Sequence, residues 1–111
     1  LNNWAGPGAD ARAVRDVTVK DVNTLATRAR RAFLEYMPIR ITKEDPTRIH
    51  RSYAFGPLLE VFMLDERSFK GPNSRNVQAE RSKASAFFGS PQLEWVKQRL
   101  KASTALWKVI A

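Results

Sequence analysis

The sequence predicts a mixed α/β (α+β) fold within a single domain, and three features of the chain indicate it. Segments 19–36 and 91–102 carry apolar residues at the three- and four-residue steps of an amphipathic helix. Segments 49–55 and 58–64 have the alternating or continuous apolar pattern of β-strands. A chain of 111 residues is long enough for one hydrophobic core and too short for two.

The first predicted helix, 19–36, has the clearest pattern. Thr18 and Asp21 stand three residues apart and resemble a capping box at its start. Pro38 ends the helical pattern, because proline cannot continue a helix. The apolar positions between these two ends are Val22, Leu25, Ala26, Ala29, Phe33 and Tyr36.

Two strands, 49–55 and 58–64, are predicted on either side of Gly56-Pro57. This spacing predicts an antiparallel hairpin. The second strand is almost continuously apolar, so we expect it in the middle of a sheet that is covered on both faces. The following segment, 66–89, shows no clear period, and a loop of this length is usually functional or mobile.

A second helix and a third strand complete the predicted elements. Ser90-Pro91 indicates an N-cap followed by proline at the first position of helix 91–102, and the apolar run 106–110 predicts the strand. Together with strand 58–64 these elements have the order of a right-handed βαβ unit with parallel strands. The residues expected to anchor the core are Trp95, Trp107, Phe87 and Phe88.

Composition and chain ends narrow the class of protein. At 43% hydrophobic and 27% charged residues the chain resembles globular proteins and not disordered ones. It has no cysteine for a disulfide or a thiolate metal site, and no apolar run of the roughly 20 residues that a membrane span needs. Because the chain begins at Leu1 and ends in the apolar run 106–110, we expect residues 1–111 to be an interior piece of a longer protein, incomplete at both ends.

The net charge of +8 raises an alternative function, a small basic module that binds nucleic acid. The local concentration of positive charge is Arg28, Arg30 and Arg31, and no run of five to eight basic residues occurs. The alternative interpretation of these arginines is a solvated helix face on which Arg31 pairs weakly with Glu35. The even spread of the other charges favours no specific nucleic-acid partner.

His50 is the only histidine of the chain, so these residues cannot complete a histidine-based metal site or a Ser-His-Asp triad. We expect it to lie on one face of its strand as an ordinary polar residue. Neither a G-x-G-x-x-G pattern nor a Walker pattern is present, which leaves no phosphate-binding loop of those types.

Two polar clusters are candidate sites. Asp65-Glu66-Arg67 follows the central strand, and α/β proteins gather reactive groups at the carboxyl ends of their strands. The alternative is that Asp65 caps the next turn or pairs with Arg67. Asn2-Asn3-Trp4 offers amide oxygens for a hard cation such as calcium and amide N–H groups for phosphate, and its alternative is a pair of turn-forming asparagines.

Six blocks of sequence then carry a resemblance to a known family. They are NNW at 2–4, AFLEYMPIR at 32–40, RIHRS at 48–52, FMLDERS at 62–68, FGSPQLEW at 88–95 and STALWKVI at 103–110. In this order, and spread over nearly the whole chain, they resemble the alkaline phosphatase D (PhoD-like) family of metallophosphatases.

The resemblance implies a metal-dependent phosphodiesterase and phosphomonoesterase that is secreted, periplasmic or associated with the cell wall. It also implies a calcineurin-like metallophosphoesterase β-sandwich flanked by helices, with iron(III) and calcium in the site. The implied partners are a phosphate mono- or diester substrate and the remainder of the catalytic domain, of which residues 1–111 form a central part.

The resemblance assigns roles to four residues. It carries a metal or phosphate contact onto Asn3 and Asn2, with Asn3 slightly favoured, and it implies that Asp65 and Arg67 support the site without binding the metal. The family's Asp-Asp-His-Glu segment, which precedes Asn-Asn-Trp, and its later Gly-Asp-x-His segment are both absent from this sequence. We therefore expect the 111-residue piece alone to be inactive.

Overall fold

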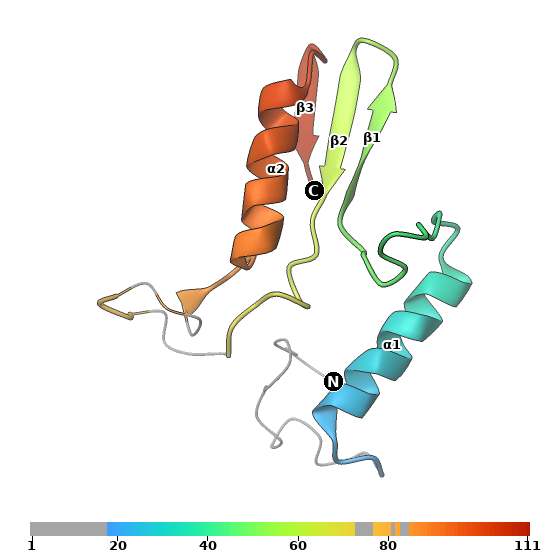
Figure 1. The fold of residues 1–111 in the computed structure, drawn as a ribbon, viewed down its shortest axis with the longest axis vertical. Helices are drawn as coiled ribbons and strands as arrows, with labels where there is room; N and C mark the ends of the chain where they lie inside the picture. The colour runs from blue at the N-terminus through green and yellow to red at the C-terminus, as the bar shows by residue number, and fades with distance from the viewer. Residues whose placement is uncertain (1–17, 73–76, 81, 83–84) are drawn as a thin grey trace.

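The computed structural model describes residues 18–72, 77–80, 82 and 85–111 (Figure 1). Its elements in chain order are α1 (Val22–Tyr36), β1 (Arg51–Phe55), β2 (Leu59–Met63), α2 (Ser90–Ala102) and β3 (Trp107–Ile110). These are the five predicted segments, which confirms the mixed α/β class. The predicted two-sheet sandwich extends beyond what the described residues show, because they form one three-stranded sheet. No helix in the described ranges is long and apolar enough to cross a membrane.

Helix α1 begins three residues later than the sequence pattern predicted. Its N-cap is Asp21, whose carboxylate accepts hydrogen bonds from the backbone N–H groups of Asn23 and Thr24, both at 3.1 Å. These bonds satisfy donors that the first helical turn leaves free. With the hydrogen bond from the Thr24 hydroxyl, they hold the pKa of Asp21 below its usual value. The predicted cap at Thr18 is therefore wrong, whereas the predicted end before Pro38 is confirmed.

The sheet has the order β1-β2-β3, and its pairings confirm both predicted connections. Strands β1 and β2 are antiparallel and are joined through Gly56, whose φ of +60° is a left-handed conformation that glycine adopts without steric cost. Strands β2 and β3 are parallel, with α2 as the crossover. Figure 1 shows α2 running along the sheet, with α1 beyond the carboxyl end of β2.

Only one face of this sheet is packed by described residues. Phe62 is fully buried beneath α2, where Val96 is also buried. On the opposite face Met63 is 41% exposed and Trp107 is 68% exposed. The expectations that β2 is covered on both faces and that Trp107 anchors the core are therefore wrong for the described part of the chain. The reason is strand alternation, since Trp107 pairs in register with Leu59 and so points away from α2.

The start of α2 differs from the prediction in a way that matters for the site. The helix begins at Ser90, and its N-cap is Gly89, which has no side chain to form a capping bond. Gly89 has a φ of +69°, and a Cβ atom there would lie 3.0 Å from the Cβ of Phe69. Glycine is needed at this position for both reasons. The expected anchor Phe87 lies nearby and is 48% exposed, so it is not a core residue in the described structure.

Candidate functional site

The candidate site is the turn that follows β2, and the side chain of Asp65 stabilises this turn. The Asp65 carboxylate Oδ1 accepts hydrogen bonds from the backbone N–H groups of Arg67 at 3.1 Å and Ser68 at 2.8 Å. An aspartate that binds N–H groups two and three residues ahead stabilises a tight turn. The residue is 92% buried, with 8% of its surface exposed. These hydrogen bonds are the ones that the turn-capping interpretation of Asp65 requires.

Gln92 fixes this turn to α2, and the sequence analysis did not identify it. Its side chain is fully buried. Its Oε1 accepts from the Asp65 N–H at 2.7 Å, and its Nε2 donates to the carbonyl oxygens of Asp65 and Phe88, both at 3.0 Å. The Gln92 amide therefore pairs with both backbone groups of Asp65 as a neighbouring strand would. The available sequence signal was its position four residues before Val96, on the inward face of the helix.

His50 is buried beside this turn and is not the ordinary polar residue that we expected. Its ring makes edge-to-face contacts with Trp95, at a centroid distance of 4.8 Å, and with Phe69, at 5.6 Å. Its Nδ1 atom is buried and has no hydrogen-bond partner within the described residues. Burial, followed by the nearby Arg48 guanidinium, lowers the pKa of His50, which favours the neutral ring.

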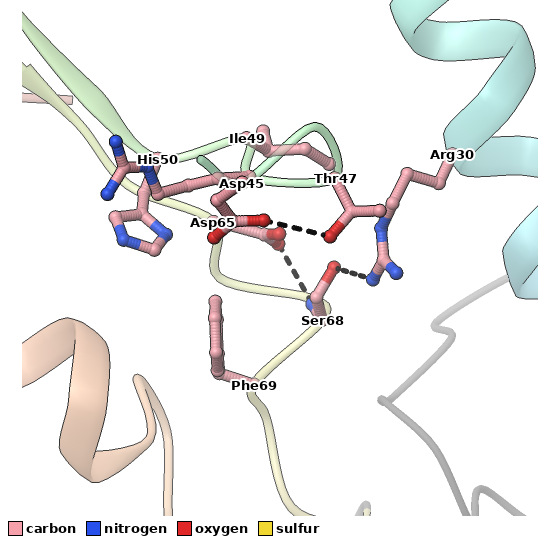
Figure 2. Close-up of a pocket in the computed structure, with 9 residues that line it drawn as sticks. Arg30, Asp45, Thr47, Ile49, His50, Asp65, Ser68 and Phe69 are labelled. Carbon is pink, nitrogen blue, oxygen red and sulfur yellow. Dashed lines mark hydrogen bonds between the residues drawn. The ribbon is translucent and has the colours of Figure 1, made fainter. Parts of the chain in front are cut away.

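A pocket of about 210 Å³ lies between α1, the loop before β1 and the turn after β2 (Figure 2). From α1, Arg30 Nη2 donates to Ser68 Oγ at 3.0 Å, which links the helix to the turn. On the loop, Thr47 Oγ1 donates to Asp45 Oδ1 at 3.1 Å. The pocket therefore contains groups of both charges. Its lining residues are Arg30, Asp45, Thr47, Arg48, Ile49, His50, Asp65, Ser68 and Phe69.

Comparison with known proteins identifies the family. A sequence model of the PhoD-like phosphatases matches residues 1–111. The chain belongs to the PhoD-like phosphatase family. The alkaline phosphatase D of Bacillus subtilis (strain 168) is 27% identical to it over 92 residues, which is 75% of this chain and 16% of that protein. No solved structure matches the chain.

The described residues of this PhoD-like chain do not form a metal site. No group of three or more His, Asp or Glu side chains within the described ranges could hold a metal ion. At the candidate turn, Oδ1 of Asp65 is already engaged by two backbone N–H groups. Asn2 and Asn3, the positions predicted to contact metal or phosphate, lie outside the described residues. The expectation of iron(III) and calcium is therefore not matched by any donor set in the described structure.

The three arginines of α1 do not act together as one basic patch. Arg30 is half-buried and donates to Ser68, whereas Arg28 is exposed. Arg31 forms the predicted ion pair with Glu35, with 2.6 Å between Arg31 Nε and Glu35 Oε1. This pair raises the pKa of Arg31 but is solvent-exposed, so it contributes little to stability. The arrangement gives no support to the nucleic-acid-binding alternative.

Proposed function

We propose that residues 1–111 are a central part of the catalytic domain of a metal-dependent phosphoesterase that hydrolyses phosphate mono- or diesters. The observation that carries this proposal is the PhoD-like phosphatase match over residues 1–111. The similarity to an alkaline phosphatase D supports the same reaction class. Because the aligned part is 16% of that relative, the activity belongs in this proposal to the whole enzyme.

Within this enzyme, the described residues act as a scaffold for the turn after β2. Gln92 and Asp65 fix the backbone of that turn by four hydrogen bonds, two accepted by Asp65 Oδ1 and two made by the Gln92 amide with the backbone of Asp65. In the proposal, Asp65 and Arg67 shape the surroundings of the catalytic site and do not bind metal. The burial of Asp65 supports a structural contribution of this kind.

The metal ions of the proposed enzyme, iron(III) with calcium by resemblance, are held largely by residues beyond this chain. Asn3, or Asn2 beside it, is the proposed contact to a metal or to the substrate phosphate. We also propose that the enzyme is secreted, periplasmic or associated with the cell wall, again by resemblance. The described residues contribute no step to the metal chemistry.

The exposed face of the sheet supports the proposal that more of the catalytic domain packs against it. Five of its apolar side chains are at least 40% exposed: Tyr53, Phe55, Met63, Trp107 and Val109. Exposed apolar surface of this kind usually marks a contact with another part of a protein. We therefore expect residues 1–111 alone to hydrolyse no phosphate ester.

The test is a hydrolysis assay on the intact protein that carries these residues. The substrate is a chromogenic phosphodiester, assayed as purified, after a chelator has removed the metals, and after iron and calcium have been added back. We expect activity that the chelator abolishes and that the metals restore, and no activity from residues 1–111 alone. Absence of turnover by the metal-loaded intact protein with both a monoester and a diester, or turnover by the isolated piece, would contradict the proposal.

A second arm of the same assay tests the proposed contact. Asn3→Ala in the intact protein should lower kcat/KM at least tenfold, because a lost contact to a metal or to the reacting phosphate weakens transition-state stabilisation. The matched control is Asn23→Ala, since Asn23 is an exposed asparagine in the first turn of α1. Equal kcat/KM values for the two variants would contradict the proposed contact between Asn3 and the metal or the phosphate.

A further inference from the structure

His50 occupies a junction of three segments that lie far apart in the sequence. It precedes β1, its ring contacts Trp95 of α2, and its ring also contacts Phe69 at the end of the turn after β2. Phe69 in turn lies against Gly89, where a Cβ atom would be only 3.0 Å away. The imidazole therefore helps to hold the turn against the start of α2.

The imidazole has an unsatisfied polar atom and space beside it. Nδ1 is buried and without a partner among the described residues, which is costly for a polar group that could bind water or a carboxylate elsewhere. His50 also lines the pocket of about 210 Å³, together with Asp65 and Asp45 (Figure 2). The imidazole and the two carboxylates therefore border the same space.

Charged groups act on His50 from the segments around it. Arg48 and Arg51, on its own segment, disfavour a proton on the ring. Asp45, from the preceding loop, and Asp65, from the turn after β2, favour a proton. Helix α2 presents the uncharged Trp95 to the ring, and none of its charged side chains is among the groups that act on His50 within the described structure.

We propose that His50 is a proton-operated latch for the turn after β2. The neutral ring packs between Trp95 and Phe69 and holds this turn against α2. The protonated ring leaves the aromatic contacts for the carboxylates of Asp65 and Asp45, and this movement releases Phe69 and competes for the Asp65 oxygen that closes the turn. The proton comes from solvent and returns to it, so the change is reversible.

The neutral form of His50 is the one that packs in the folded protein, and this sets the direction in which pH changes the packing of the turn. Because burial lowers the pKa of the folded His50 below the ordinary value of 6.5, the unfolded chain binds the proton more readily than the latched one. The latch is therefore fully closed above about pH 6.5 and weakens as the pH falls below that value.

The test is hydrogen exchange of the intact protein between pH 8 and pH 5, followed by mass spectrometry on the peptide spanning 64–70. Protection factors are corrected for the intrinsic pH dependence of exchange, and a peptide from the last turn of α2 serves as the reference. We expect protection of 64–70 to fall several-fold as the pH drops below 6.5 and to recover at pH 8. Unchanged protection of 64–70 across this range would overturn the proposal.

Two variants assign the effect to the named groups. His50→Phe keeps an aromatic ring that cannot be protonated, so the protection of 64–70 should become independent of pH. Asp65→Asn keeps an acceptor for the two N–H groups of the turn but removes the charge, so the transition should move to lower pH. A wild-type transition in His50→Phe, or an unmoved transition in Asp65→Asn, would overturn the proposal. If His50→Phe does not fold, the wild type and Asp65→Asn still decide the question.

Discussion

The two faces of the three-stranded sheet differ in how deeply their side chains are buried. On the face that α2 covers, the buried polar side chains have hydrogen-bond partners. On the side that α2 covers, Phe62 of β2 and Gln92 of α2 are fully buried, and buried Glu60 accepts a 3.4 Å hydrogen bond from Arg99. On the other face, Phe55 and Trp107 are 60% and 68% exposed. The covered face thus combines apolar packing with partnered polar side chains, whereas the other face, the open face, carries large apolar side chains that stay exposed in the described structure. The covered face positions the candidate turn, and the open face is a surface for further structure.

The largest effect should come from the covered face. Phe62→Ala removes a fully buried aromatic side chain and leaves a cavity beneath α2, which should lower the free energy of unfolding by about 3 to 5 kcal/mol. Urea denaturation of the intact protein, monitored by circular dichroism, measures this change. The control is Phe87→Ala, which truncates a phenylalanine that is 48% exposed and should cost less than half as much. Similar costs for the two variants would show that α2 does not seal this face.

The next effect concerns the polar part of the covered face. Gln92→Leu keeps the approximate volume of the side chain but deprives Asp65 N–H and two carbonyl oxygens of their partners. Buried groups without partners should lower the free energy of unfolding by about 2 to 3 kcal/mol. The matched control, Gln98→Leu, changes an exposed glutamine of the same helix and should stay within about 0.5 kcal/mol of the wild type. Denaturant midpoints and slopes of both variants give the comparison, and a near-neutral Gln92→Leu would contradict the assigned hydrogen bonds.

A third substitution tests whether the open face is covered in the intact enzyme. Val109→Asp places a carboxylate on this face, and if the remainder of the catalytic domain packs there, its burial should cost about 2 kcal/mol or more. The control is Val77→Asp, because Val77 is 81% exposed and lies outside the sheet. Thermal unfolding of the intact protein should therefore separate the two variants. Equal melting temperatures would mean that the open face remains in solvent, and the proposed packing of the catalytic domain would be wrong.

Local pattern predicted the elements, but not which sheet face would be covered. The three-and-four spacing predicted α1, and an alternating strand and a nearly continuous apolar strand on either side of Gly56-Pro57 predicted the hairpin, because these patterns depend on neighbouring residues. The apolar residues Leu59 and Phe62 point to opposite faces of β2, and nothing in their hydrophobicity distinguishes the face that α2 covers.

The same limit applies to the candidate site. The sequence indicated turn capping as one of the interpretations of Asp65, because its partners are only two and three residues away. Gln92 lies 27 residues from Asp65, and the burial of His50 depends on Trp95, which belongs to a different element. The sequence therefore did not indicate Gln92, and the expectation for His50 was wrong. Asn2 and Asn3 remain predictions, because they lie outside the described residues.

The smallest effect should come from a site that belongs to neither face, the N-terminus of α1. Asp21→Ala removes the cap from an exposed helix end, and the loss of stability should be clearly smaller than that of Phe62→Ala or Gln92→Leu. Asp21→Asn is the control, since asparagine caps helices about equally well and should preserve most of the stability. Because its hydrogen bonds lower the pKa of Asp21, the contribution of its charge is present above the ordinary aspartate pKa of 3.8 and is lost as the pH falls through the lowered value. The difference in melting temperature between wild type and Asp21→Ala should therefore shrink in acid, and a difference that grows there would show that the carboxylate does not cap α1 in its charged form.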